Sequence, residues 1–424
     1  TEIYTLSLHD ALPIYPPNLL SDRGERGSMP VHHPNRRQLI ASAAPLFVPA
    51  SAFGANDKPA YGLIATGNRG RGLHRSFMKL GARCLALCDV YEPYLAMARE
   101  MTPGDVKTHI DYRALLEQKG LDFVVIASPD HQHAPMLEAS LAAGKDVYLE
   151  KPLSMNIEES QRMVQMVRSR KQVVQIGMQR RSMGFIRQAK KVIDDGTLGP
   201  VTMVKAMWNW HFDLPLVNAP LEGKLDWDLF LGPAPKRDLE PMRFRWWRGF
   251  WDYSGGNMTD QGTHLMDVVQ WMTGQGAPKS AVCQGQVTRV PGAEVPNVFS
   301  AVFEYPEFLA TWTLNYRSTH EHDWSITFMG EKATMFMDRR GYRLYRDGGL
   351  MREPWTYNQK PELIAEVPDT DSPEAHQQNF LDCLRSRQEP NCPIEVAAAA
   401  VAGPHMANMA LRRERKIVMG QPAS

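Results

Sequence analysis

The sequence predicts an α/β fold in which a doubly wound parallel sheet precedes an α+β domain built on a mainly antiparallel open sheet. Strand-like and helix-like segments alternate from residue 59 to 180, which is typical of βαβ units. After about residue 200, long β-prone segments dominate and turn residues separate most of them. The length of 424 residues fits two or three domains of ordinary size.

The elements of the first domain follow in βαβ order. The fully apolar run Phe123–Ala127 is typical of a strand that is buried on both faces. Gly144 closes the helix that precedes the strand Val147–Leu149. The predicted strands span 61–65, 84–88, 123–127, 147–149 and 173–176, and the predicted helices span 70–80, 92–101, 112–118, 134–143 and 156–169.

The second domain is predicted from β-prone segments and two C-terminal helices. The strands are expected at 201–210, 281–290, 298–305, 309–316 and 324–337, and the helices at 374–385 and 395–412. All ten tryptophans lie between Trp208 and Trp355. Aromatic faces suit sugar rings, although core packing explains most of these side chains.

Charge and cysteine content exclude several classes of protein. The 48 Lys and Arg nearly cancel the 47 Asp and Glu, so the net charge of +1 gives no footprint for nucleic acid or an anionic membrane. No apolar run approaches the ~18 residues of a membrane-spanning helix. The five cysteines do not make a disulfide scaffold. His131 and His133 lack zinc-ligand spacing with the cysteines upstream, so we expect no metal site.

The N-terminal segment differs from the rest of the chain. The run Thr1 to Ile14 resembles a translated sequencing adapter and Met29 offers a start, so we expect 1–28 to be a non-native leader; the alternative is a genuine disordered leader. Paired arginines at 36 and 37, an apolar stretch and Ala50-Ser51-Ala52 predict a twin-arginine export signal over 29–55. We therefore expect a periplasmic or secreted protein, or a cytoplasmic one if this basic segment is not a signal.

A glycine-rich loop follows the first predicted strand. The run Ala65-Thr66-Gly67-Asn68-Arg69-Gly70 is a G-x-G-x-x-G loop with alanine in the first glycine's place. Gly67 would let the backbone approach a pyrophosphate, and Gly70 would let helix and strand pack closely. Asp89 ends the second strand, nineteen residues after Gly70 (89 − 70), where a carboxylate binds ribose hydroxyls. The pattern predicts a Rossmann dinucleotide-binding domain over 59–180 that prefers NAD to NADP, although Arg69 and Arg71 could favour a phosphate.

Further motifs follow in a specific order. They are Ser128-Pro129-Asp130-His131, Glu150-Lys151-Pro152, the segment 175–181 and Asp260-Gln261-Gly262-Thr263-His264. Behind a Rossmann loop, this set resembles the Gfo/Idh/MocA oxidoreductase family, named for glucose–fructose oxidoreductase and inositol dehydrogenase. The resemblance covers residue 59 to the C-terminus and implies a substrate-binding α+β domain over 181–424. Combined with the loop, it implies that the cofactor contacts Ala65, Gly67, Asn68, Arg69, Gly70, Asp89, Ser128, His131, Glu150, Lys151 and Gln179.

The chemistry of alcohol oxidation points to three side chains. Asp260 and His264 are four residues apart, so on a helix they would share one face. His264 has the intrinsic pKa of a base near neutrality, and Asp260 can orient the substrate or the imidazole. Lys151 is expected to polarise the reacting oxygen, but a cationic, partly buried surrounding would also make it a possible base. The choice of base between Lys151 and His264 stays open, because coupled groups titrate together.

The sequence leaves three functions open. The first is an NAD-dependent oxidoreductase that acts on a sugar or polyol hydroxyl, with a small carbohydrate as substrate and neither nucleic acid nor membrane as partner. The second is an NAD-dependent glycoside hydrolase that works by transient oxidation and elimination, which an exported protein with a retained cofactor would suit. The third is a non-catalytic NAD-binding regulator, against which the intact catalytic residues argue. The basic and aromatic run Arg243–Arg248 is interpreted as a carbohydrate-pocket wall, and we expect a homo-oligomer.

Overall fold

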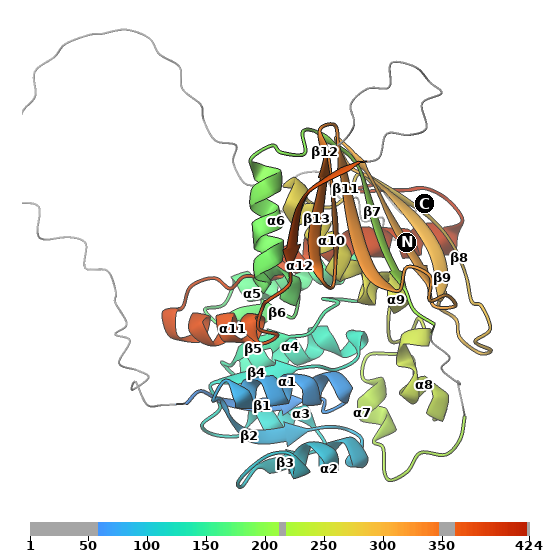
Figure 1. Ribbon diagram of the computed structural model, residues 1–424. Helices are drawn as coiled ribbons and strands as arrows, with labels where there is room; N and C mark the ends of the chain where they lie inside the picture. Colours follow the sequence, from blue (N-terminus) through green and yellow to red (C-terminus); the bar gives the residue numbers. More distant parts are fainter. Residues whose placement is uncertain (1–57, 212–217, 347–360, 422–424) are drawn as a thin grey trace, which may run out of the picture. The chain divides into compact units, whose positions relative to one another are not determined.

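Six short strands form a parallel sheet in the order β3-β2-β1-β4-β5-β6. They are β1 (Ala60–Ile64), β2 (Arg83–Cys88), β3 (Lys107–His109), β4 (Phe123–Ile126), β5 (Asp146–Leu149) and β6 (Val174–Ile176). Every residue of β1 and β4 is buried, as a sheet with helices on both faces requires. The strand order reverses between β1 and β4, which is where such sheets bind ligands. A computed structural model, describing residues 58–211, 218–346 and 361–421, provides this architecture (Figure 1).

The helices of this domain confirm the predicted βαβ alternation. They are α1 (Asn68–Lys79), α2 (Glu92–Glu100), α3 (Tyr112–Leu116), α4 (His133–Ala142) and α5 (Ile157–Arg168). Strand β3 was not predicted, because Lys107-Thr108-His109 is polar and partly exposed and carries no apolar pattern. The predicted leader over 1–28 and the export signal over 29–55 lie outside the described residues. Within the described ranges, no helix is both long and apolar enough to cross a membrane.

Nine strands build the second sheet, in the order β14-β13-β12-β11-β7-β10-β9-β8-β15. Neighbours pair antiparallel except β7 and β10, which run parallel, so the mainly antiparallel sheet is confirmed. The strands are β7 (Val201–Asn209), β8 (Ser280–Gln286), β9 (Val298–Glu304), β10 (Leu309–Asn315), β11 (Asp323–Gly330), β12 (Ala333–Asp338), β13 (Gly341–Arg346), β14 (Glu362–Pro368) and β15 (Ile417–Val418).

Two predicted strands of this sheet were wrong in extent. The segment predicted as one strand over 324–337 is the antiparallel hairpin of β11 and β12. The run contains no Pro, Asn or Asp and a single glycine, Gly330, so its turn has little local signal. A Cβ at Gly330 would lie 2.2 Å from the carbonyl oxygen of Leu198. The strand predicted over 281–290 ends at Gln286.

Helices cover one face of the nine-stranded sheet and also join it to the parallel sheet. The helices of this part are α6 (Gly184–Asp194), α7 (Trp227–Leu231), α8 (Pro241–Arg245), α9 (Gly256–Asp260), α10 (Gly262–Thr273), α11 (Ala375–Ser386) and α12 (Ile394–Arg413). Helices α10 and α12 pack on each other and on the sheet (Figure 1). The first half of α12 packs into the core of the parallel sheet through Ile394 and Val401, and its second half packs into the core of the other sheet through Met406. The predicted domain boundary near residue 180 stays a prediction.

Candidate active site

The loop after β1 turns tightly into α1. Ala65 has φ of 67°, in the left-handed region that favours glycine, so alanine in the first glycine's place is strained. Gly67 caps α1, and a Cβ there would meet only the Tyr94 ring, at 4.0 Å. A Cβ at Gly70 would lie 2.0 Å from the carbonyl oxygen of Ala65, so this position needs glycine for the helix to approach the strand. The backbone at Gly67 therefore has open space beside it, whereas Gly70 is closely packed against the end of β1.

A cavity of about 300 Å³ opens beside this loop. It lies at the carboxyl ends of β1, β2 and β4, where the strand order reverses. Six of the predicted cofactor contacts line it: Ala65, Gly67, Asn68, Arg69, Asp89 and Ser128. The buried Ser128 hydroxyl has no hydrogen-bond partner in the described parts of the chain. Helix α1 points its first amides toward the same region, so the residues present fit the phosphates and ribose of a dinucleotide.

Asp89 is buried at the rim of this cavity. Its Oδ2 accepts hydrogen bonds from the Thr66 amide at 2.6 Å and the Thr66 hydroxyl at 3.0 Å, and its Oδ1 accepts one from the Tyr91 amide at 2.9 Å. Burial raises the pKa of Asp89, against these hydrogen bonds. Oδ2 already accepts two hydrogen bonds, whereas Oδ1 accepts one and keeps a lone pair for a further donor. The side chain is thus fixed in orientation and still able to accept from a ribose hydroxyl.

The remaining predicted cofactor contacts lie away from the cavity lining. Gly70 packs under the loop, while His131 joins its Nε2 to the carbonyl of Phe230 at 2.8 Å. Glu150 is buried and pairs with Arg69, whose Nη2 lies 2.6 Å from Oε1. Gln179 leaves its Oε1 buried without a partner among the described residues. The ion pair of Arg69 and Glu150 connects the phosphate loop to the end of β5, where Lys151 follows Glu150.

Lys151 and Asp260 meet directly, although 109 residues separate them in the chain. Lys151 donates from Nζ to Asp260 Oδ1 at 2.6 Å and to the Asp260 carbonyl at 2.9 Å. Arg248, which lines the cofactor cavity, places its Nε 3.3 Å from Asp260 Oδ2. Burial alone would raise the pKa of Asp260, but the positive charges of Arg248 and Lys151 lower it to about 2. Asp260 is therefore a carboxylate at neutral pH, held between two cations.

Asp130 is a second buried carboxyl group in this cluster, which sequence reasoning did not single out. Its Oδ2 accepts a hydrogen bond from the Ser254 hydroxyl at 2.6 Å. Burial, and then the negative charge of Asp260, raise the pKa of Asp130 to about 7. Near neutral pH, Asp260 is thus ionised, whereas Asp130 is close to the middle of its titration. Asp130 lies in the motif Ser128-Pro129-Asp130-His131. Its role in the site becomes visible from its hydrogen bond with Ser254, which lies 124 residues later in the chain.

His264 lies on α10, and Gln261 separates this helix from α9, which ends at Asp260. Gln261 keeps helical dihedral angles, so the predicted spacing of Asp260 and His264 holds across two helices rather than one. His264 is buried, and its Nδ1 has no partner in the described part of the chain. Burial, followed by the positive charges of Arg180 and Lys151, holds the pKa of His264 well below its usual value. The imidazole is therefore neutral near pH 7.

The basic and aromatic run 243–248 lies at the cofactor cavity. Phe244, Arg245, Trp247 and Arg248 line it, opposite the phosphate loop. The interpretation of this run as a carbohydrate-pocket wall stays a prediction, and the structure places four of its residues in the lining of the cavity beside the phosphate loop. Arg248 reaches from there to Asp260, the partner of Lys151.

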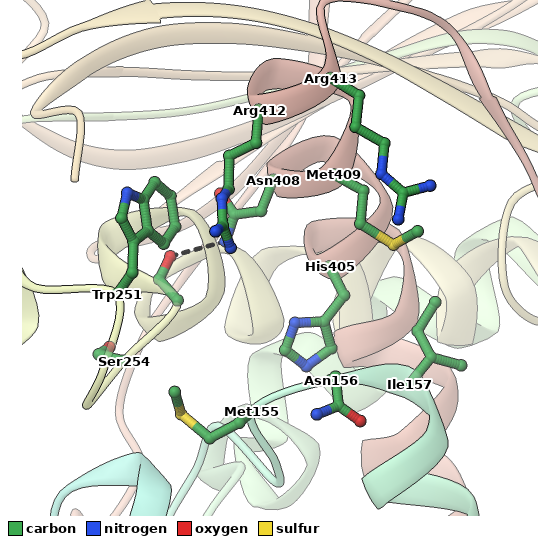
Figure 2. Close-up of a pocket in the computed structure, with 11 residues that line it drawn as sticks. Met155, Asn156, Ile157, Trp251, Ser254, His405, Asn408, Met409, Arg412 and Arg413 are labelled. Atoms are coloured by element: carbon green, nitrogen blue, oxygen red, sulfur yellow. Dashed lines mark hydrogen bonds between the residues drawn. The ribbon is translucent and has the colours of Figure 1, made fainter. Parts of the chain in front are cut away.

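A second cavity, of about 360 Å³, contains none of the predicted site residues (Figure 2). It lies between the start of α5 and the last turns of α12, where the Arg412 guanidinium stacks over Trp251 at 5.1 Å. Asn408 donates to the carbonyl of Gly255 at 2.8 Å, the dashed line in Figure 2. Ser254 lines this cavity and donates a hydrogen bond to Asp130. Ser254 therefore connects the second cavity to the cluster of Asp130 and Asp260.

Comparison with known proteins agrees with this arrangement. Residues 60–178 match the model of the oxidoreductase family with an NAD-binding Rossmann fold. Residues 186–336 match the GFO/IDH/MocA C-terminal domain. The two matches follow each other along the chain, so both sheets belong to one family architecture.

Curated relatives share sequence with part of the chain. Inositol 2-dehydrogenase of Salmonella typhimurium is 32% identical over 126 residues, which cover 29% of this chain and 37% of that protein. Levoglucosan dehydrogenase of Pseudarthrobacter phenanthrenivorans is 25% identical over 202 residues, covering 47% of this chain and 45% of the relative. The chain thus matches less than half the length of either relative.

Solved structures share the fold over nearly their whole length. The WlbA dehydrogenase of Bordetella pertussis, solved with NADH and UDP-GlcNAcA, has a TM-score of 0.65 at 20% identity and covers 86% of this chain and 99% of its own. Levoglucosan dehydrogenase in complex with NADH has a TM-score of 0.67 at 15% identity, with coverages of 85% and 99%. At these identities the likeness shows the fold alone. The two family matches, over residues 60–178 and 186–336, show that the chain belongs to the Gfo/Idh/MocA family of oxidoreductases, with an NAD-binding Rossmann domain at residues 60–178.

Proposed function

We propose that the protein is a dehydrogenase that oxidises a hydroxyl group of a sugar or polyol with NAD. The observation that carries the proposal is the buried ion pair of Lys151 and Asp260 at the carboxyl edge of a dinucleotide-binding sheet, with the charge of Lys151 acting on the buried, neutral His264. The inositol and levoglucosan dehydrogenases among the relatives support a polyhydroxylated substrate. When bound, the nicotinamide supplies a hydride acceptor.

Each catalytic side chain has a task that its surroundings support. Lys151 presents an ammonium that Asp260 orients through two hydrogen bonds, so it can donate to the reacting oxygen and stabilise its developing negative charge. His264 accepts the hydroxyl proton, because its imidazole is neutral and its Nδ1 is without a partner among the described residues. Of the two candidate bases, this geometry favours His264, since Lys151 is engaged by a carboxylate.

The preference for NAD over NADP is part of the same proposal. Asp89 would accept from the ribose hydroxyls and repel a 2′-phosphate. The two arginines that could bind such a phosphate are engaged elsewhere: Arg69 pairs with Glu150, and Arg71 donates to the Thr66 carbonyl and to Asn68, each at 2.7 Å. This engagement supports NAD as the cofactor.

The experiment that tests the function is turnover with a panel of cyclic polyols, sugars and aryl glycosides, using the full chain with NAD or NADP. We expect NADH formation with at least one polyol or sugar, a lower rate with NADP, and a smaller difference between the cofactors in Asp89→Ala. Release of the aryl group without net NADH would instead indicate the redox glycosidase. NAD binding with neither reaction would indicate a regulator.

A further inference from the structure

Arg180 is a buried cation at the same edge of the parallel sheet as Lys151. It lies in the short helix η4 (Gln179–Ser182) directly after β6, the strand that pairs with β5, from whose end Lys151 follows. Only 6% of Arg180 is exposed. Among the cations that lower the pKa of His264, Arg180 acts more strongly than Lys151. Its guanidinium therefore belongs to the surroundings of the proposed catalytic base.

Two indole rings hold the Arg180 guanidinium. Its Cζ lies 4.4 Å from the ring centre of Trp324 and 5.2 Å from that of Trp208. These tryptophans are direct partners on β7 and β11, so they present neighbouring rings on the sheet. Contacts of this kind stabilise a cation by its charge and leave its N–H groups without an acceptor.

No carboxylate of the described chain neutralises Arg180. The acidic groups whose charges act on it are Asp323 and Asp267, and both are bound to other arginines. Arg339 Nη2 lies 3.0 Å from Asp323 Oδ1, and Arg181 Nε lies 2.7 Å from Asp267 Oδ1. Asp267 Oδ2 has no hydrogen-bond partner among the described residues, Arg180 included. Among the described residues, the positive charge of Arg180 thus has no carboxylate of its own in an ion pair.

The unpartnered donor atoms around Arg180 indicate which kind of chemical group could bind there. Both the Nε of Arg180 and the Nε1 of Trp208 are buried without a hydrogen-bond partner among the described residues. Neither group can accept a hydrogen bond, so only an acceptor can satisfy them. Burying such donors and a charge without a partner is costly. An anionic oxygen group would satisfy the donors and the charge together.

We propose that Arg180 and Trp208 bind the carboxylate of the substrate, so that the protein prefers an acidic sugar over its neutral counterpart. The inference rests on the proposed function and names its substrate class. A carboxylate carries the single negative charge that compensates one guanidinium, whereas a sugar phosphate carries close to two. Arg180 is a specificity-determining residue in this arrangement: it fixes the acidic end while Lys151 and His264 act on a hydroxyl.

The test compares acidic and neutral sugars of matched configuration with NAD-saturated full-length protein. The pairs are D-glucuronate with D-glucose, D-galacturonate with D-galactose, and D-gluconate with D-sorbitol, and a hexose phosphate serves as the other anion. Binding is measured by calorimetry, and KM and kcat are measured by NADH formation. Arg180→Gln removes the charge, Arg180→Lys keeps it, and Arg385→Gln is the control, because it removes an arginine that is half exposed on α11.

We expect at least one acid to bind about tenfold to a hundredfold more tightly than its neutral partner, the range for a charged hydrogen-bonded contact. Arg180→Gln should abolish this difference through KM for the acid, Arg180→Lys should restore part of it, and Arg385→Gln should retain it. The inference is overturned if acids and neutral sugars bind equally, if no acid binds, if the hexose phosphate binds best, or if Arg180→Gln weakens both members alike. Turnover of neutral sugars alone would overturn the inference and leave the dehydrogenase standing. Acid binding that depends on Arg180, without turnover of any sugar, would support the anion site and contradict the dehydrogenase.

Discussion

Asp130 shows how one buried side chain can link the active site to stability. The carboxyl group is buried, with Ser254 as its donor and the charge of Asp260 close by, and its pKa is raised from 3.8 to about 7. When folding raises the pKa of a group, the protonated group favours the folded state. This contribution to the free energy of unfolding is complete below the pKa that the group has in the unfolded chain, and it is lost as the pH rises through the pKa that it has in the folded protein. Asp130 should therefore destabilise the protein increasingly between about pH 4 and pH 7.

Asp130→Asn removes this ionisation and keeps an oxygen that can accept from Ser254. We expect the variant to gain stability over the wild type as the pH rises from 4 to above 7, by up to roughly 4 kcal/mol for a shift of this size. Chemical unfolding across this pH range measures the gain. Asp111→Asn is the control: hydrogen bonds from Arg113 lower the pKa of Asp111, so its contribution is lost toward acid pH instead. A gain from Asp130→Asn that does not change with pH would contradict the account.

At the scale of an element, α1 carries two glycines with different requirements. Gly70 faces the loop, where a Cβ would clash with the Ala65 carbonyl at 2.0 Å. Gly72 lies two residues later on the same helix, and a Cβ there meets nothing within 4 Å. The sequence motif marked Gly70 but could not distinguish these environments, because the difference depends on how the helix sits against the strand.

Gly70→Ala should lower stability by about 1–3 kcal/mol, the usual range for overpacking, and weaken NAD binding. Gly72→Ala should raise stability by about 0.5–1 kcal/mol, because alanine loses less backbone entropy in a helix. Thermal unfolding and NAD titration of both variants check the pair. If Gly70→Ala bound NAD as tightly as Gly72→Ala, the close approach of α1 to the loop would not matter for the cofactor.

At the scale of the whole molecule, the sequence predicted both sheets and most helices of the parallel domain. Apolar runs such as Phe123–Ala127 carry a strong local signal, so they were found within one or two residues. The hairpin of β11 and β12 was read as one strand, because its turn lacks a local signal. The catalytic residues were predicted from their motifs and stay a prediction, while the structure brings two of them, Lys151 and Asp260, into an ion pair.

What the sequence could not supply is the set of contacts between distant segments. Ser254 reaches Asp130, and Arg180 stacks on Trp208 and Trp324, because the fold brings together segments that lie far apart in the chain. Arg248 reaches Asp260 within one segment, twelve residues further along (260 − 248). None of these contacts could be predicted from a sequence spacing or a motif. Helix α12, which packs into both cores, is part of the same long-range assembly.

The central claim is that the protein transfers a hydride from a sugar or polyol to NAD. The most direct test measures the transfer of deuterium from a labelled substrate to the cofactor. The full-length protein is incubated with NAD and sugars or polyols deuterated at carbon, and the mass of the reduced cofactor is measured over time. We expect deuterium in NADH, with formation in His264→Gln slowed by about 10²–10⁴-fold, the usual contribution of a general base, at unchanged NAD affinity. No label in the cofactor with any substrate despite bound NAD, or equal rates in the wild type and His264→Gln, would contradict the account.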